Sequence, residues 1–231
     1  MKTALLLLIA AIAFAISPFL NPEFGGFDPN RYPLPQVDPP VQPAGYAFAI
    51  WGPIYLWLLV STVFGLWRRA HAPDWVAFRL PLVVSLAVGA AWLPVALIAP
   101  IPATVMIWVM LIGAVVAMLR APVLDHWWVA APVGLYAGWL TAASFVALGL
   151  SLAGYGLMSE TTAAYVCLVG ALVFAIAVLM RRGVATYGAA VVWALIAVAV
   201  QNWGAFDRLV ILALASAAVV AAVTLWQMQK K

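Results

Sequence analysis

Charged side chains are scarce in this chain, and their scarcity excludes most soluble folds. Only 8% of the 231 residues are Asp, Glu, Lys or Arg, whereas 68% are hydrophobic. Soluble domains are about one-quarter charged and about half apolar. The composition therefore predicts an integral membrane protein in which almost the whole chain is membrane domain, without room for a separate water-soluble catalytic module.

Cysteine and histidine are also nearly absent. The single cysteine, Cys167, cannot form an intramolecular disulfide, and it lies in a hydrophobic run. A buried lone cysteine usually behaves as a small apolar residue, so we expect a structural role. His71 and His126 have no second His or Cys at ligand spacing. This favours interfacial residues over haem or metal ligands.

No Asp, Glu, Lys, Arg or His lies well inside an apolar segment, since Arg79, Glu160 and Arg208 all lie at segment ends. Proton relays and ion-coupled carriers need intramembrane ionisable groups. Their absence argues against a pump, an ion-coupled symporter and a voltage sensor. The usual general acid–base pairs are missing too. An enzyme is therefore the least supported class, and we predict no catalytic and no metal-binding residues.

Apolar segments of membrane-spanning length dominate what is present. A span needs about 20 mainly apolar residues. Two prolines, Pro100 and Pro102, interrupt helical structure between the third and fourth segments. The sequence Arg181-Arg182-Gly183 separates the sixth segment from the seventh. Eight spans are predicted, over residues 3–20, 46–67, 79–99, 102–119, 128–153, 161–180, 184–202 and 208–228.

The loops between these spans alternate in charge. By the positive-inside rule, the side with most of the basic residues is cytoplasmic, and both termini lie on it. The basic residues are thus topology signals, and nucleic-acid binding is not expected. Nine of the eleven basic residues fall on that side: Lys2, Arg68, Arg69, Arg79, Arg120, Arg181, Arg182, Lys230 and Lys231. Five of the seven acidic residues fall on the other: Glu23, Asp28, Asp38, Glu160 and Asp207.

The first span and the loop after it each allow two interpretations. Lys2 followed by the run from Leu5 to Ile16 resembles a signal peptide, but its near-spanning length favours a retained helix. Residues 21–45 contain seven prolines together with Gly25 and Gly26, which predicts an extended extracytoplasmic loop. This loop is either a plain linker or a lid over a cavity that opens on that side.

An unusual cluster of aromatic residues begins the second span. Trp51 and Tyr55 are four residues apart and share a face of a helix, and Phe48 extends that face by one turn. Trp92, Tyr136 and Trp139 add further rings in later spans. Such rings either fill a bundle core or line a pocket for a flat ligand.

The stretch from Pro43 through Tyr46, Phe48 and Trp51 to Tyr55 resembles the second helix of the TspO/MBR family, the tryptophan-rich sensory proteins that include the mitochondrial translocator protein. The family has a proline-rich loop, then aromatic residues and a Trp and Tyr at this spacing. Pro53 follows the tryptophan here, whereas the family has a proline before it.

Two later segments agree with the family in the same order. Trp92 and Pro94 match an Asn-x-x-Trp-x-Pro-like element, with Gly89 where the family has Asn. Tyr136 and Trp139 fit a Tyr-x-x-Trp element in the fifth span.

The resemblance implies an all-α integral membrane protein with a five-helix bundle over residues 1–155 and a three-helix extension over 156–231. It also implies a homodimer or a larger membrane complex, in a bacterial inner membrane. Family members bind porphyrins, other tetrapyrroles, sterols and aromatic drugs, so the bound ligand expected here is a porphyrin or another tetrapyrrole. The ligand-binding residues that the resemblance implies are Phe48, Trp51, Tyr55, Trp92, Tyr136 and Trp139.

Three functions remain open from the sequence. The first is a membrane receptor or binding protein for a tetrapyrrole or similar hydrophobic aromatic ligand, with a sensory or regulatory role. The second is a transporter of a neutral or amphipathic solute, although no inverted repeat is evident. The third is a structural subunit of a larger membrane complex, with the Ala- and Val-rich final spans as a docking surface.

Overall fold

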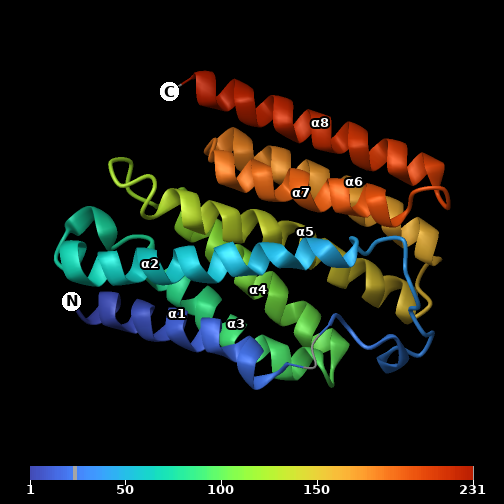
Figure 1. Cartoon of the computed structure of the whole chain (residues 1–231), viewed down its shortest axis with the longest axis horizontal. Coiled ribbons are helices and arrows are strands. Elements are labelled where there is room, and N and C mark those ends of the chain that lie inside the picture. Colours follow the sequence, from blue (N-terminus) through green and yellow to red (C-terminus); the bar gives the residue numbers. More distant parts are fainter. Residues whose placement is uncertain (23–24, 231) are drawn as a thin grey trace.

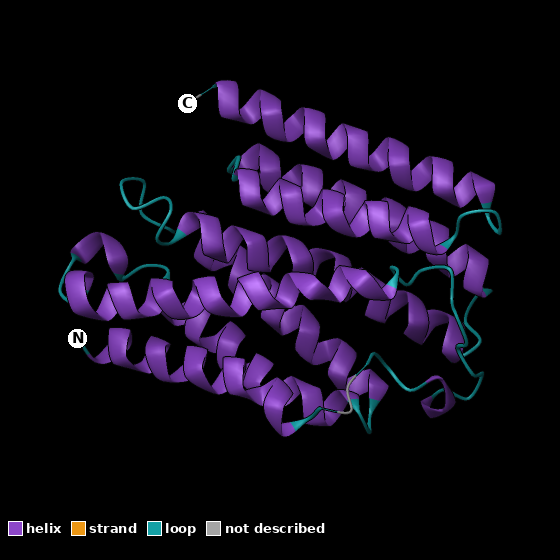
Figure 2. Cartoon of the chain, in the orientation of Figure 1, coloured by secondary structure: helices purple, strands orange, loops and turns teal. Residues whose placement is uncertain are grey.

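Helices make up all the regular structure in the computed structural model, which describes residues 1–22 and 25–230 (Figures 1 and 2). Glu23 and Lys231, which entered the charge count above, lie outside the described residues. The all-α prediction is confirmed. The α-helices are α1 (Lys2–Leu20), α2 (Trp51–Arg69), α3 (Arg79–Ala96), α4 (Pro100–Leu119), α5 (Ala130–Gly154), α6 (Glu160–Arg181), α7 (Ala185–Gln201) and α8 (Asp207–Gln229). Short 3-10 helices are η1 (Pro29–Arg31), η2 (Gly45–Ile50) and η3 (Pro73–Trp75).

Seven of these helical segments are long and apolar enough to cross a membrane. The remaining helix, α7, has 17 residues and is a shorter apolar helix. At 1.5 Å per residue it spans about 26 Å, close to the lower limit for a membrane-spanning helix. The chain is therefore a multi-pass membrane protein. Seven of the eight predicted spans meet the length criterion, and α7 lies just below it.

Proline and polar caps set several helix boundaries. The predicted break between the third and fourth spans is confirmed, because α3 ends at Ala96 and α4 begins at Pro100. Pro100 is the first residue of its helix, where no backbone N–H is needed. Ser159 caps α6, and its Oγ accepts a hydrogen bond from the Thr162 amide at 3.2 Å.

Both termini lie at the same end of the helix bundle (Figure 1). We call this the inner end. The terminal amine of Met1 donates to the carbonyl oxygen of Ala70 at 3.2 Å, which holds the start of α1 beside the end of α2. The proline-rich loop, residues 21–45, lies at the opposite end, which we call the outer end. The predicted placement of both termini on one side agrees with this arrangement.

The last three helices pack directly on the first five. Helix α7 lies against α5, and α8 covers α6 and α7. Gly138 permits the close approach, because a Cβ there would collide with the backbone carbonyl of Tyr187. At the inner end, the Arg182 guanidinium donates to the carbonyl oxygens of Met118 at 2.9 Å and Ala121 at 2.6 Å. This arginine satisfies carbonyls that the end of α4 leaves free.

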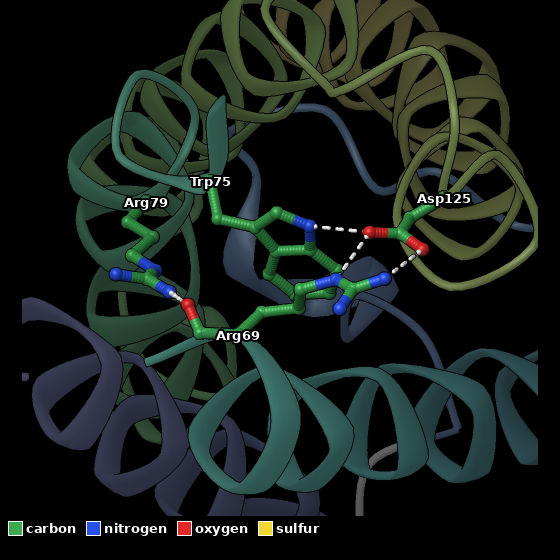
Figure 3. A network of polar contacts seen from close by, with 4 residues as sticks. All are labelled: Arg69, Trp75, Arg79 and Asp125. Atoms are coloured by element: carbon green, nitrogen blue, oxygen red, sulfur yellow. Dashed lines mark hydrogen bonds and ion pairs between the residues drawn. The ribbon is translucent and has the colours of Figure 1, made fainter. Parts of the chain in front are cut away.

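A polar network ties together three segments at the inner end (Figure 3). Asp125 accepts hydrogen bonds from Arg69 Nε at 2.8 Å and from Trp75 Nε1 at 2.7 Å. The Arg79 guanidinium donates to the Arg69 carbonyl oxygen at 2.7 Å. The hydrogen bonds from Arg69, assisted by the one from Trp75, hold the pKa of Asp125 below its usual value.

Trp75 is a core residue although it lies near a span end, where tryptophan is typical of an interfacial anchor. Its side chain is only 1% exposed and packs on Phe64 and Phe78. Its N–H finds a carboxylate 50 residues along the chain, so the residue belongs to the core. Trp67, which is 74% exposed, has the exposure expected of an anchor.

Candidate ligand-binding cavity at the outer end

The proline-rich loop enters α2 through the 3-10 helix η2. Phe48 therefore lies in η2, before α2 begins at Trp51. The prediction that Phe48 shares an α-helical face with Trp51 is wrong in this respect. Pro53 is the third residue of α2, where its missing N–H costs no helical hydrogen bond. Although Phe48 and Trp51 lie in different kinds of helix, both side chains line the same cavity.

Three rings from α1 and α2 form one wall of this cavity. Trp51 and Tyr55 are stacked, with ring centroids 5.4 Å apart and planes inclined by 17°. Phe14 of α1 meets both edge-on, at 6.0 Å from Trp51 and 5.0 Å from Tyr55. These offset and edge-to-face geometries are the ones aromatic rings prefer.

Rings from α5 stand behind this wall. Trp139 meets Phe48 edge-on at 5.8 Å and Trp51 at 6.1 Å. Tyr136 lies 6.4 Å from Trp51 and is fully buried. Its hydroxyl is hydrogen-bonded to Ser85 Oγ at 3.1 Å, so its polar atom is satisfied within the bundle.

The cavity beside these rings, which we call the main cavity, has a volume of about 360 Å³. It lies between α1, α2 and α3, and loop residues form its outer rim. Pockets for small organic ligands are about 300–1,000 Å³ and are mostly apolar with a few polar groups. The main cavity fits that description at the small end. Its lining includes Phe14, Phe48, Trp51, Tyr55, Trp92 and Asn21.

A smaller space, the side cavity, adjoins the main one. It holds about 60 Å³, and Phe48, Trp51 and Trp92 line both cavities. Trp139 forms part of its wall. The Nε1 atom of Trp139 is buried without a hydrogen-bond partner among the described residues. An unpaired buried donor of this kind costs about 1–3 kcal/mol.

A polar groove of about 660 Å³ lies outside both cavities, on the proline-rich loop and the end of α3. Gly25 lines this outer groove and the main cavity, while Gln42 lines the groove and the side cavity. The charged residues in its described lining are Asp28, Arg31 and Asp38. Asp28 and Arg31 form an exposed ion pair at 3.5 Å.

Helix α7 holds the proline-rich loop over the outer end. The Ala44 amide donates to the Ala197 carbonyl oxygen at 3.0 Å. Asn202 Nδ2 donates to the Pro40 carbonyl oxygen at 2.9 Å. Just beyond the loop, Trp193 Nε1 donates to the carbonyl oxygen of Ala47 in η2, at 3.0 Å. The loop is thus tied to α7 and to the residue that ends it.

Comparison with known protein families decides the assignment. The model of the family described as TSPO-like protein matches residues 3–226, which is nearly the whole chain. The chain belongs to the TSPO-like protein family. The matched region extends beyond the first five helices through most of α8. Neither a curated protein nor a solved structure matches the chain.

The TSPO-like fold brings together five of the six residues predicted to bind a ligand. Phe48, Trp51, Tyr55 and Trp92 line the main cavity, and Trp139 lines the side cavity. Tyr136 contacts the same ring cluster but lines neither cavity. Their role in ligand binding stays a prediction, and so does any bound tetrapyrrole.

The sequence did not reveal the roles of three residues in this region. Phe14 reads as one more apolar residue of α1, yet its ring closes the cavity against Trp51 and Tyr55. Gly89 makes room for it, because a Cβ there would lie 2.7 Å from the Phe14 ring. Trp193 sits inside an apolar run, where no pattern marks it as a loop anchor. One sequence signal did point to this packing: Gly89 stands where the family has Asn, which leaves space for a neighbouring side chain.

The side chains at this TSPO-like site are mainly aromatic and apolar. The described residues hold no group of three or more His, Cys, Asp or Glu side chains that could bind a metal ion. Apart from the indole N–H groups of Trp51 and Trp92, the hydrogen-bonding side chains in the described lining of the main cavity are Asn21 and Tyr55. Rings and small residues dominate the rest, which suits a hydrophobic aromatic ligand.

Proposed function

We propose that this chain is a membrane receptor or binding protein that holds a tetrapyrrole, or a similar hydrophobic aromatic ligand, in the main cavity. The observation that carries the proposal is a space of about 360 Å³ walled by Phe14, Trp51 and Tyr55. Flat aromatic ligands stack on indole and phenol rings. Family membership supports ligand binding within the membrane. The output of binding is then sensory or regulatory.

The two predicted parts of the chain have different tasks in this proposal. Residues 1–155 supply the cavity, because every described residue that lines it falls in this range. Residues 156–231 act on the proline-rich loop through the bond that Ala197 accepts and the bond that Asn202 donates, and on η2 through the bond that Trp193 donates. The extension thus works as a scaffold that holds a lid.

A steric block tests the proposal. Gly45 lines the rim of the main cavity, and a Cβ added there would meet no atom within 4 Å. The Cβ of Gly45→Leu therefore causes no clash, and we expect the rest of the side chain to narrow the opening. We expect saturable binding of protoporphyrin IX to wild-type protein in lipid nanodiscs, measured by tryptophan fluorescence quenching. The block should weaken that binding at least about tenfold, which corresponds to about 1.4 kcal/mol.

Gly52→Leu is the matched control. A Cβ at Gly52 also meets no atom within 4 Å, but this residue does not line the main cavity. The control should bind as the wild type does. Binding that does not saturate above that of empty nanodiscs, or equal affinities for Gly45→Leu and the wild type, would refute the proposed site.

Purification from a native membrane gives a second test. An absorption band of the porphyrin type in the purified protein would identify the ligand class directly. A colourless protein that also ignores added porphyrin would exclude tetrapyrroles and leave other aromatic ligands for the same cavity.

A further inference from the structure

The loop between α4 and α5, residues 121–129, exposes two neighbouring large apolar side chains. Val123 is 82% exposed and Leu124 is 92% exposed. A single apolar side chain on a surface needs no explanation, whereas adjacent ones at this level of exposure indicate a surface that meets an apolar partner. We call residues 121–129 the inner loop.

The fold holds the inner loop in place on both sides of these residues. Asp125 pairs with Arg69 of α2 at 2.8 Å. Further along the loop, the carbonyl oxygen of Trp127 accepts a hydrogen bond from Trp57 Nε1 at 3.1 Å, and the two indole rings are stacked. The exposed pair is thus presented by a braced segment.

The contacts with α2 also show how deep the inner loop lies. Trp57 precedes Arg69, the last residue of α2, by about 18 Å along the helix axis. Phe64 lies between the two and stacks on Trp128 of the loop at 4.1 Å. Because α2 belongs to a segment that can cross a membrane, a loop beside these residues lies at the level of the inner-end leaflet (Figure 1).

The backbone of the inner loop is satisfied as such a position requires. Non-helical backbone at membrane depth needs partners from the protein, because lipid offers none. The Arg182 guanidinium donates to the carbonyl oxygens of Ala121 at 2.6 Å and Pro122 at 3.4 Å. The bond from Trp57 serves Trp127 in the same way. Side-chain donors thus take the place that water has in a cytoplasmic loop.

Two exposed arginines lie beside the inner loop. Arg182 donates to the carbonyl oxygens of Leu119 and Ala121, the two neighbours of Arg120, so Arg120 and the Arg181–Arg182 pair lie together. Arg120 and Arg181 are exposed, and neither has an ion-pair partner in the part of the chain that the structure describes. Two free cations beside a membrane-embedded surface complement an anionic headgroup.

We propose that the inner loop is a binding surface for an anionic phospholipid of the leaflet at the inner end. Val123 and Leu124 insert among the acyl chains, while Arg120 and Arg181 hold the phosphate. The depth of the loop favours a lipid over a cytoplasmic protein as the partner. Trp127, which is 67% exposed, suits the boundary between headgroups and chains. The inference does not depend on a ligand in the main cavity.

A fluorescent label at the exposed pair tests the insertion. Cys167 is only 1% exposed, so a bimane group on Leu124→Cys reports on that position alone, and unaltered protein should take up no label. In nanodiscs, phosphatidylcholine with brominated acyl chains should quench this label strongly, and aqueous iodide should not. Val123→Cys gives the same reading if Leu124→Cys does not fold.

His71→Cys is the matched control, because His71 is exposed and follows the end of α2 directly. Its label should respond to iodide and not to brominated lipid. A label at position 124 that responds in the same way as the control overturns the insertion and places the loop in the cytoplasm.

The preference for anionic lipid tests the two arginines. Quenching of the label at position 124 by brominated phosphatidylglycerol and by brominated phosphatidylcholine gives the ratio of their binding constants. We expect phosphatidylglycerol to bind about five- to thirtyfold more tightly, the factor for one or two arginines near an anionic lipid. Arg120→Gln combined with Arg181→Gln should bring the ratio close to one.

Lys2→Gln combined with Lys230→Gln is the matched control, since it removes the same charge from the inner end at the two ends of the chain. This variant should keep the ratio. An equal loss in both double variants overturns the headgroup site, because it shows diffuse attraction only. Loss of the ratio when phosphate replaces chloride at equal ionic strength overturns the lipid assignment in favour of free phosphate.

Discussion

Helix α2 carries an aromatic cluster at each end, and the two clusters are built differently. At the inner end, Phe64 and Trp128 stack at 4.1 Å with planes 6° apart, and Trp75 packs against Phe64. At the outer end, the rings of Trp51 and Tyr55 line a cavity of about 360 Å³. The same residue types thus form a filled core in one place and a walled space in the other.

The polar atoms show the same contrast. Trp75 and Trp139 are almost equally buried, at 1% and 2% exposure. The N–H of Trp75 has a carboxylate partner, Asp125, whereas the N–H of Trp139 has none among the described residues. A cluster whose donors are paired within the chain stabilises the fold. A cluster beside a cavity with an unpaired donor is suited to a molecule that arrives from outside.

The largest expected effect is on the inner cluster. Asp125→Ala removes the shared acceptor and leaves the buried Trp75 N–H unpaired, while Arg69 loses its ion pair. We expect a loss of about 3 kcal/mol in the free energy of unfolding, measured by thermal or denaturant unfolding in detergent. Ligand affinity measured well below the melting temperature should stay unchanged. An equal loss of affinity would contradict the separation of the two clusters.

The second largest expected effect is a loss of ligand affinity when the outer cluster is altered. Trp51→Ala removes a ring that lines both cavities, so affinity for an aromatic ligand should fall about 30-fold, or about 2 kcal/mol. This affinity is measured by tryptophan fluorescence quenching and by equilibrium dialysis, both with the protein in nanodiscs. Trp67→Ala, on the same helix but 74% exposed, is the control and should bind normally. Similar affinities for the two variants would remove the outer cluster from the site.

Low pH should reduce the contribution that Asp125 of the inner cluster makes to folding stability. Because the pKa of Asp125 is lowered in the folded state, its contribution to stability is present above the unfolded value of about 3.9 and is lost as pH falls through the lower folded value. The melting temperature of the wild type should therefore approach that of Asp125→Asn below about pH 4. A difference between the two proteins that stays constant from pH 7 to pH 3 would contradict this assignment.

The smallest expected effect is a faster ligand dissociation when a hydrogen bond next to the proline-rich loop is removed. Trp193→Phe keeps an aromatic contact to Tyr46 and removes the hydrogen bond to the Ala47 carbonyl oxygen. Loss of one such bond, worth about 1 kcal/mol, should speed ligand dissociation about three- to fivefold in stopped-flow experiments. Trp203→Phe is the control, since Trp203 is 73% exposed. Unchanged dissociation in Trp193→Phe would show that the loop does not gate the cavity.

The helical architecture of the chain follows from local sequence signals. Long apolar runs, proline at Pro100 and the basic pair at Arg181 and Arg182 placed the helix boundaries within a few residues, since these signals are local. The spacing of Trp51 and Tyr55 also predicted their shared face, because four residues make about one helical turn. The ordered aromatic motifs were enough to indicate the family that the comparison confirmed.

Which rings line a cavity and which fill a core depends on how distant helices pack together. The burial of Trp75 depends on Asp125, 50 residues away, and the position of Phe14 depends on the missing side chain at Gly89. Hydrogen-bond partners and cavities arise between helices that are distant in the chain, so no local pattern encodes them. The unpaired N–H of Trp139 belongs to this class, because it becomes visible only when every neighbour is in place.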